Sequence, residues 1–463
     1  MINEANTPSL QRLTLTMVLV NAFTTPLMLS AVNVALPSIA RDLSLTAIQV
    51  SWIPMAYLMA SAMFVMIFGR FADMFGRKRI FLIGTSCVIV SSVIAALATN
   101  ANILIIARFL QGMSAAMLYA TQVALVSSVY PPAKRGQVIG LVVSMIYFGL
   151  TIGPLIGGFV VDEFGWRIAF LIHIPLALVA IMTGMLFIKT DWLAEEKGSL
   201  DLFGALAYCI SIMMLCIAVS FMPSTNAWIV LLVALLGLAF FIAYENKHKH
   251  PILDVSLFFT NRVFTYSCLA SLIIYTATFA NVVQISLYLQ YLKDMSATTA
   301  GLIMLCQPLT MAIFSPLSGK LSDKFEPRQL ASAGMLTSAI GLVLLSQLNI
   351  TSSLTYLIIA LIVTGFGFGL FSSPNVNAIM STVDKQQLGR ANGVVATMRI
   401  LGQMTSMMLV TLVFATILGN AEIQPQNYMQ LEKAIRTIFT FAAILCLPGL
   451  YFSLARGRLR DAA

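Results

Sequence analysis

Long apolar runs recur from one end of this sequence to the other, and no other feature constrains the fold as strongly. A run of about twenty residues with few charges is long enough to cross the hydrocarbon core of a bilayer as a helix. Fourteen such runs lie at 13–36, 50–68, 80–98, 103–126, 137–160, 168–188, 202–221, 227–244, 264–290, 299–318, 329–347, 354–378, 391–417 and 433–454. Since helices satisfy their own backbone polar groups in lipid, the sequence predicts an all-α polytopic membrane protein with 14 transmembrane helices.

Composition excludes several classes of protein. The chain has 463 residues, of which 59% are hydrophobic and only 10% charged, a balance that a soluble domain of this size does not tolerate. Its net charge of +9 is spread over many short loops, so we expect no nucleic-acid partner. The six cysteines lie in apolar runs without metal-ligand spacing. We therefore expect free thiols, no metal and no cofactor. With no visible nucleophile–base pair we also expect no enzyme. The first run is too long for a cleavable signal peptide.

The distribution of basic residues predicts the orientation. An even number of spans places both termini on one side of the membrane. If that side is the cytoplasm, 20 Lys and Arg lie in inner loops and tails and five lie outside, which is a strong positive-inside bias. We expect a monomeric multi-pass protein with both termini in the cytoplasm. Its location would be the plasma membrane, which is the inner membrane of a cell that has two.

The loop after the second span carries the most specific motif. Gly69 and Gly76 allow a tight reversal of the chain, and Asp73 lies one turn beyond Gly69, where it can meet an arginine or a helix N-terminus. Arg77 and the two basic residues after it would hold the turn at the cytoplasmic face. An ordinary basic loop does not require both glycines and the aspartate at these spacings.

A degenerate copy of this loop follows the tenth span, with Gly319 and Asp323 at the matching positions. The copy falls where a duplicated half would place it if two helices were inserted between two six-helix halves. The sequence thus divides into a first half at 1–188, two inserted helices with cytoplasmic linkers at 189–263, and a second half at 264–463.

Two spans contain unusual polar or small residues. In the fourth span Arg108 is a permanent cation inside the membrane, followed by Gln111. Such a charge faces a cavity or a partner, although carbonyls and hydroxyls could equally satisfy a structural arginine. The fifth span has small residues at a spacing that lets helices touch backbone to backbone, with a proline that bends it; generic packing is the alternative. These residues are Gly149, Gly153, Pro154, Gly157 and Gly158.

These motifs resemble those of the major facilitator superfamily. The loop G-x-x-x-D-x-x-G-R-K-R, the stretch R-x-x-Q-G and the stretch G-x-x-x-G-P-x-x-G-G are similar to its fourteen-helix drug:proton antiporter branch. So is the stretch from Trp166 to Pro175, in which His173 stands where that branch usually has asparagine. The resemblance implies the major facilitator fold, a gating role for the loop and a link between Arg108 and proton transfer. His173 could titrate or be a neutral core residue.

The second half carries a glycine-faced span ending in a kink at Pro374, and a second membrane cation, Arg399. One departure from the branch is important. Met28 occupies a position that is commonly acidic there, and no carboxylate lies well inside any span. This absence argues against cationic drugs as the main substrates. Polar candidates for lining a substrate pathway, each equally compatible with a packing role, are Tyr57, Tyr119, Gln122, Tyr147, Asn281, Gln284 and Gln307.

The leading functional interpretation is a secondary transporter that works by alternating access and exports amphipathic organic compounds, driven by the proton gradient. Its partners would be a small organic substrate, protons and the bilayer. The alternative is a carrier of an anionic or neutral metabolite such as a vitamin. A non-transporting membrane sensor is disfavoured by the intact gating motifs. For the coupling of transport to protons, the sequence favours Arg108 as the electrostatic anchor of the cavity and His173 as the group that takes up and releases the proton. If His173 is structural, Asp162 or Asp294 would have to carry the proton.

Overall fold

The computed structural model describes residues 7–193, 201–247, 252, 258, 261–322, 324–383 and 388–457. It contains 14 helices long and apolar enough to cross a membrane, which confirms the all-α prediction. The first seven helices are α1 (Pro8–Asp42), α2 (Ala47–Phe75), α3 (Arg77–Ala96), α4 (Ala101–Val129), α5 (Pro132–Phe164), α6 (Trp166–Ala169) and α7 (Ile174–Met182), which ends in the π-helical turn η1 (Thr183–Phe187). Next come α8 (Leu202–Ser220) and α9 (Thr225–Glu245). The rest are α11 (Arg262–Thr278), α12 (Asn281–Leu287), the π-helical turn η2 (Tyr288–Leu292), α13 (Ala297–Met304), α14 (Cys306–Ser322), α15 (Pro327–Ser346), α16 (Leu354–Ser381), α17 (Leu388–Ile417), the short 3₁₀ turn η3 (Pro425–Asn427) and α18 (Tyr428–Ala455).

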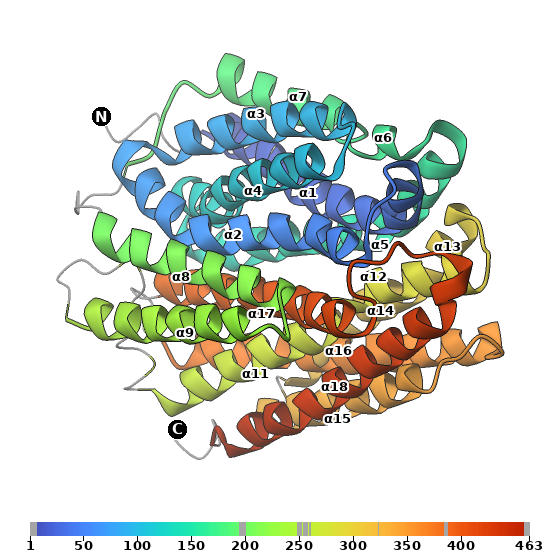
Figure 1. Cartoon of the computed structure of the whole chain (residues 1–463). Coiled ribbons are helices and arrows are strands. Elements are labelled where there is room, and N and C mark those ends of the chain that lie inside the picture. Colours follow the sequence, from blue (N-terminus) through green and yellow to red (C-terminus); the bar gives the residue numbers. More distant parts are fainter. Residues whose placement is uncertain are drawn as a thin grey trace.

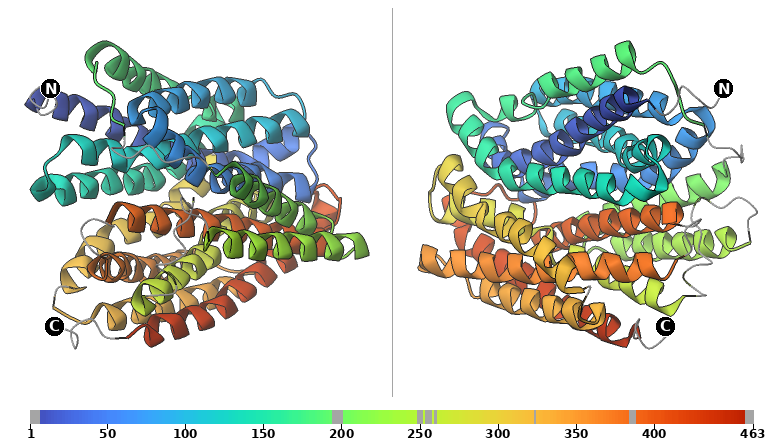
Figure 2. Two further views of the ribbon diagram at one scale, coloured as in Figure 1. Left: turned by 90° about the vertical axis from the view of Figure 1, so that its left-hand side faces the viewer. Right: turned by 180° about the vertical axis from the view of Figure 1, so that it is seen from behind.

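The helices form two bundles that lie side by side. Figure 1 shows α1 to α7 above and α11 to α18 below, with α8 and α9 across the front. We call these the first and second bundles. The views of Figure 2 show the same division from two other sides. Asp323, in the second copy of the loop, lies outside the described residues.

The helices span the molecule between two ends, which we call the Arg41 end and the Arg77 end after one residue at each. The Arg41 end holds the connections after α1, α3, α5 and α17, and the Arg77 end holds the connections after α2 and α4. The first and last described residues, Thr7 and Gly457, both lie at the Arg77 end, on the left of Figure 1.

The surface of the molecule has the polarity of a membrane protein. Leu236 and Leu447 are each 61% exposed, whereas Arg108 is fully buried. Exposed leucine, isoleucine and valine side chains also lie on the outward faces of α3, α7 and α15. Because lipid is as apolar as the protein interior, this arrangement leaves the polar side chains of the spans to face one another.

Helix ends follow local sequence signals. At the start of α2 the Thr46 hydroxyl accepts from the Gln49 amide, and the Gln49 side chain accepts from the Thr46 N–H at 3.0 Å, which is a capping box. Between α2 and α3 the chain turns at Gly76, whose φ of 110° favours glycine.

Three predicted spans are interrupted. Within 168–188 the helix stops after Ala169 and restarts as α7, because Pro175 has no N–H to continue the preceding helix and fits the first turn of a new one. Within 299–318 the break falls at Leu305, where Pro308 has no N–H to donate to the preceding turn. Within 264–290 the break lies between α11 and α12, and the Ala280 N–H donates to the Ser406 hydroxyl at 3.0 Å.

Pro374 does not end the glycine-faced span. The helix α16 continues through this proline to Ser381, near the end of the predicted span at 378, and the kink at Pro374 stays a prediction. Membrane helices tolerate an internal proline, since neighbouring groups satisfy the freed backbone carbonyl.

Candidate functional site

Among the described residues, the motif loop is bonded to the first bundle and to the segment that directly follows it. The Arg77 guanidinium donates to the Asp73 carboxylate at 3.0 and 3.2 Å and to the Ser128 hydroxyl on α4 at 2.8 Å. The Asp191 carboxylate accepts from the backbone N–H groups of Lys78 and Arg79 at 2.9 and 3.2 Å. It therefore caps the N-terminus of α3, a role for which the sequence gives no signal.

Position 76 requires glycine because a side chain would not fit there, in addition to the positive φ. A Cβ at this position would lie 2.3 Å from the Asp191 carboxylate. In the second bundle, a Cβ at Gly319 would lie 2.7 Å from the Ser373 hydroxyl. Both motif glycines thus allow another segment to approach the turn closely.

The glycines of α5 face two different partners. Added Cβ atoms at Gly149, Gly153 and Gly157 would lie within 2.5 Å of atoms of α1, in the same bundle. A Cβ at Gly158 would instead lie 2.3 Å from the carbonyl oxygen of Ala297, on α13 of the second bundle. The motif therefore mostly fixes α5 on α1, and its last glycine belongs to the contact between bundles.

That contact closes the Arg41 end. The Asp162 carboxylate accepts from the N–H groups of Ala297 and Thr298 at 3.1 and 2.7 Å, so an acid of the first bundle caps a helix of the second. A Cβ at Gly301 would lie 2.2 Å from the Pro154 carbonyl oxygen, so α5 and α13 touch backbone to backbone.

A second set of contacts joins α1 to η2 at the same end. The Arg41 guanidinium donates to the Gln290 carbonyl at 2.9 Å and lies 4.9 Å from the centre of the Tyr291 ring. The Gln290 side chain donates to the Val34 carbonyl at 2.9 Å. Among the described residues, every hydrogen bond between the two bundles lies at this end or near mid-span.

Arg108 lies at the centre of a buried network in the first bundle. Its Nε donates to the Ile53 carbonyl at 3.1 Å and its Nη1 to the Gln111 side chain at 2.9 Å. The guanidinium carbon lies 4.5 Å from the centre of the Tyr57 ring, a cation–π distance. Nη2 has no hydrogen-bond partner. A Cβ at Gly112 would lie 2.0 Å from the Tyr57 carbonyl oxygen, so the motif glycine brings α4 against α2.

Two further hydrogen bonds connect this arginine to His173. The Gln111 amide donates to the Ser92 hydroxyl at 2.7 Å, and that hydroxyl lies 3.3 Å from Nε2 of His173. His173 is buried, and its Nδ1 has no partner. The Gln111 amide also points at the Met28 sulfur, 3.4 Å away. Met28, which occupies the position that is commonly acidic in the drug:proton antiporter branch, therefore contacts this network.

Several polar candidates from both bundles meet near mid-span. The Tyr57 and Tyr119 hydroxyls are 3.0 Å apart, and the Tyr147 hydroxyl lies 3.1 Å from Ser372 on α16. Arg399 on α17 is half-buried, and its charge interacts electrostatically with the hydroxyls of Tyr57 and Tyr119.

Three other candidates are buried with polar atoms that have no hydrogen-bond partner. They are Gln122 (Nε2), Asn281 (Nδ2) and Gln284 (both side-chain polar atoms), and the Oδ1 of Asn33, which was not a candidate, also has none. Gln307 is buried on α14. Buried polar atoms without partners are costly, and in native structures they mark places where water or a ligand binds.

Arg456 is one of the 20 basic residues assigned to the inner loops and tails, but its side chain is buried. It donates to Asn375 at 2.7 Å, to the Pro327 carbonyl at 2.7 Å and to Ser267 at 3.2 Å, and so ties the end of α18 to three other helices. Its position near the chain end hid this structural role.

Comparison with known proteins agrees with the helical arrangement. Residues 18–199 and 267–461 match the sequence profile of the Major Facilitator Superfamily. The chain belongs to the Major Facilitator Superfamily. It is accordingly a multi-pass membrane transporter.

Named relatives fall into two substrate groups. Riboflavin transporter RibZ of Clostridioides difficile is 29% identical, over 93% of this chain and 94% of that protein. Multidrug resistance protein Stp of Mycobacterium tuberculosis is 29% identical, over 87% of this chain and 75% of its own length. Multidrug transporter protein MdtP of Bacillus subtilis is 28% identical, over 77% and 67%.

Proposed function

We propose that this superfamily member is a secondary transporter that exports amphipathic organic compounds by alternating access, driven by the proton gradient. The observation that carries the proposal is the distribution of contacts between the bundles. Hydrogen bonds across them are confined to mid-span and the Arg41 end among the described residues, and a group of tyrosines and a half-buried arginine lies at mid-span.

With the Arg77 end in the cytoplasm, as the basic residues favour, this conformation would be closed to the outside. The Asp73 carboxylate is held by Arg77 within the first bundle. In the opposite conformation we propose that the motif loop contacts the second bundle and closes the cytoplasmic end, while the contact between Asp162 and α13 opens.

The direction of transport and the driving ion are proposed from the sequence motif and the relatives. The glycine motif of α5 resembles that of drug antiporters, and two of the named relatives are multidrug proteins. A carrier of a vitamin or another metabolite is the second candidate. It is supported by the relative named as a riboflavin transporter and by the described carboxylates, all of which lie at or near helix ends.

For coupling we propose that Arg108 anchors the buried network and that His173 exchanges the proton. The chain of Gln111 and Ser92 supports this assignment, because it places the imidazole two hydrogen bonds from the guanidinium. A proton arriving on His173 would then reorganise the Ser92 and Gln111 hydrogen bonds next to the fixed charge.

Reconstitution of the full chain into liposomes tests the function. A panel of cationic, neutral and anionic amphipathic compounds is offered with and without an imposed pH gradient, and the flux of each compound is measured. Liposomes prepared without protein serve as the control. Gradient-driven movement opposite to protons is expected. Movement together with protons would make the protein an importer, and flux equal to that of the protein-free liposomes would refute transport.

A further inference from the structure

The charges available between the two bundles determine which substrates can bind there. Among the described residues, every carboxylate lies at or near a helix end or in a loop, whereas Arg108 and Arg399 lie well inside spans. The mid-span region is therefore positive and has no described acid to neutralise it. In a region of low dielectric constant such an imbalance is a strong filter on the charge of a ligand.

The two arginines differ in how free their guanidinium groups are to bind a ligand. Arg108 is fully buried, and it is already bonded to a carbonyl, an amide oxygen and an aromatic ring. Arg399 is half-buried, and its guanidinium forms no hydrogen bond or ion pair with another described residue. Since a planar guanidinium presents a fork of N–H donors that fits an oxyanion, Arg399 is the group that can bind one.

Aromatic side chains of both bundles lie on the helices that pack against α17. A Cβ at Gly402, one turn beyond Arg399, would lie 2.8 Å from the Tyr275 Cβ on α11 of the second bundle. From the first bundle, α2 packs on α17, and its Tyr57 hydroxyl lies 3.0 Å from that of Tyr119 on α4. The Tyr275 ring packs edge-on against Phe368, with centroids 5.3 Å apart, so it is held in place. Tyr119 and Tyr275 are half-buried, which leaves part of each ring free to contact a ligand.

A nearby amide supplies a polar group that lacks a protein partner. Gln122 lies one turn beyond Tyr119 on α4, is 3% exposed, and its Nε2 forms no hydrogen bond. A buried N–H donor of this kind is satisfied when a carbonyl or ring nitrogen of a ligand accepts from it.

We propose that Arg399, with Tyr119, Tyr275 and Gln122, forms a binding site for planar aromatic compounds that carry an oxyanion, and that it excludes organic cations of the same shape. This inference rests on the proposed transport function and names its substrate class. The guanidinium binds the oxyanion, the rings of Tyr119 and Tyr275 contact the aromatic plane, and the Gln122 amide donates to a heteroatom at its edge.

Matched dyes test the charge preference directly. Fluorescein and rhodamine 123 share a xanthene ring system but carry opposite charges, and flavin mononucleotide and riboflavin differ by one phosphate. Binding of each to the purified full chain in nanodiscs is measured by equilibrium dialysis. We expect fluorescein to bind at least tenfold more tightly than rhodamine 123, and flavin mononucleotide more tightly than riboflavin.

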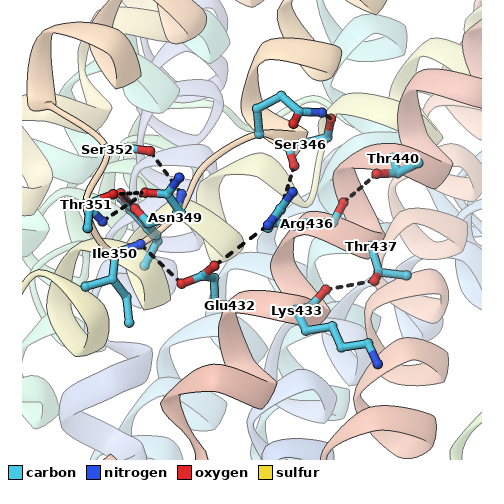
Figure 3. Close-up of polar contacts among 12 residues, drawn as sticks. Ser346, Asn349, Ile350, Thr351, Ser352, Glu432, Lys433, Arg436, Thr437 and Thr440 are labelled. Carbon is cyan, nitrogen blue, oxygen red and sulfur yellow. Dashed lines mark hydrogen bonds and ion pairs between the residues drawn. The ribbon is translucent and has the colours of Figure 1, made fainter.

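Variants then assign the preference to Arg399. Arg399→Gln should weaken binding of the two anions by about ten- to 100-fold, the range for loss of a charge-assisted hydrogen bond, and leave rhodamine 123 unaffected or better bound. Arg399→Lys should keep part of the preference. The control is Arg436→Gln. That arginine bonds to the Ser346 carbonyl and lies 3.9 Å from Glu432 in a surface groove of about 390 Å³ between α15 and α18, at the Arg41 end (Figure 3).

Three results would overturn the inference: tighter binding of rhodamine 123 than of fluorescein, no binding of any of the four probes, or an Arg399→Gln variant that folds and keeps the wild-type anion preference. Size-exclusion profiles and melting temperatures establish folding for each variant. Liposome transport separates this failure from failure of the proposed function. A wild type that transports rhodamine 123 but not fluorescein remains a transporter and lacks the anion site.

Discussion

Adjacent glycines in α5 allow the contact between the bundles to be perturbed without changing the rest of the helix. In the Gly158→Ala variant the new Cβ would lie 2.3 Å from the Ala297 carbonyl oxygen, where an ordinary contact is at least 3.4 Å. The start of α13 must therefore retreat by about 1 Å from α5. A retreat of that size also lengthens the bonds from Asp162 to the N–H groups of Ala297 and Thr298.

The energetic effect follows from these two changes. Overpacking by one methyl group costs about 1–3 kcal/mol, and this cost applies only to the conformation in which the Arg41 end is closed. At 1.4 kcal/mol per tenfold change, the closed conformation should lose about 5- to 140-fold in population relative to the open one. The weakened hydrogen bonds of the Asp162 carboxylate lower the population of the closed conformation further.

Two other glycines of α5 provide matched controls. A Cβ at Gly157 would press on Ala31 of α1 inside the first bundle, so Gly157→Ala should lower stability without opening the Arg41 end. A Cβ at Gly140 has no neighbour within 4 Å, so Gly140→Ala should change neither property.

Spin labels at exposed positions on the two sides of the contact report the opening. In a background without the six native cysteines and with retained transport, labels replace Glu163 on α5 and Leu302 on α13, and the distance between them is measured by pulsed electron resonance. A longer distance population should appear in Gly158→Ala alone. A Gly158→Ala distribution identical to that of Gly140→Ala would refute the argument, as would equal opening in Gly157→Ala.

The remaining predictions concern the gate, the loop and the buried network. Asp162→Ala removes the cap on α13 and should shift the same label distances toward the open population by about tenfold; an unchanged distribution would show that the cap is incidental. Asp73→Ala should express normally and abolish turnover in liposomes, and wild-type flux from a well-expressed variant would exclude a gating role. Arg108→Gln removes the guanidinium bonds to the Ile53 carbonyl and the Gln111 side chain and should remove transport, with a stability loss of about 1–3 kcal/mol seen as a lower melting temperature. His173→Asn should preserve binding and flatten the pH dependence of transport, whereas a wild-type pH profile would make the histidine structural.

Much of the fold could be predicted because apolar length alone specifies a membrane span. The fourteen spans and the all-α class are confirmed. The interruptions at Leu305 and before α7 could have been anticipated from Pro308 and Pro175, since proline lacks the N–H that continues a helix. The break before α12 had no such signal, because its cause is a hydroxyl on α17, far away in the sequence.

The candidate site was predictable only where spacing along one helix decides a contact. Arg108 and Gln111 lie one turn apart, and they are bonded. Ser92, which connects Gln111 to His173, comes from α3, and only the packing of three helices reveals it. Asp191 was missed for a similar reason, since a loop carboxylate carries no periodic signal that would connect it to α3.

The attachment of α8 makes the two sides of the molecule unequal. Tyr208 and Cys209 bond to backbone carbonyls of α2, and the Trp52 indole donates to Ser220, so α8 is bonded to the first bundle. It also packs on α17, without a hydrogen bond between the described residues of the two helices. In a rocking motion α8 would therefore travel with α2 and slide over α17. The contact between α2 and α17 therefore stays covered by α8, whereas no described helix lies over α5 and α14 in the view from behind (Figure 2). Only one of the two sides of the contact between the bundles thus carries an added pair of helices.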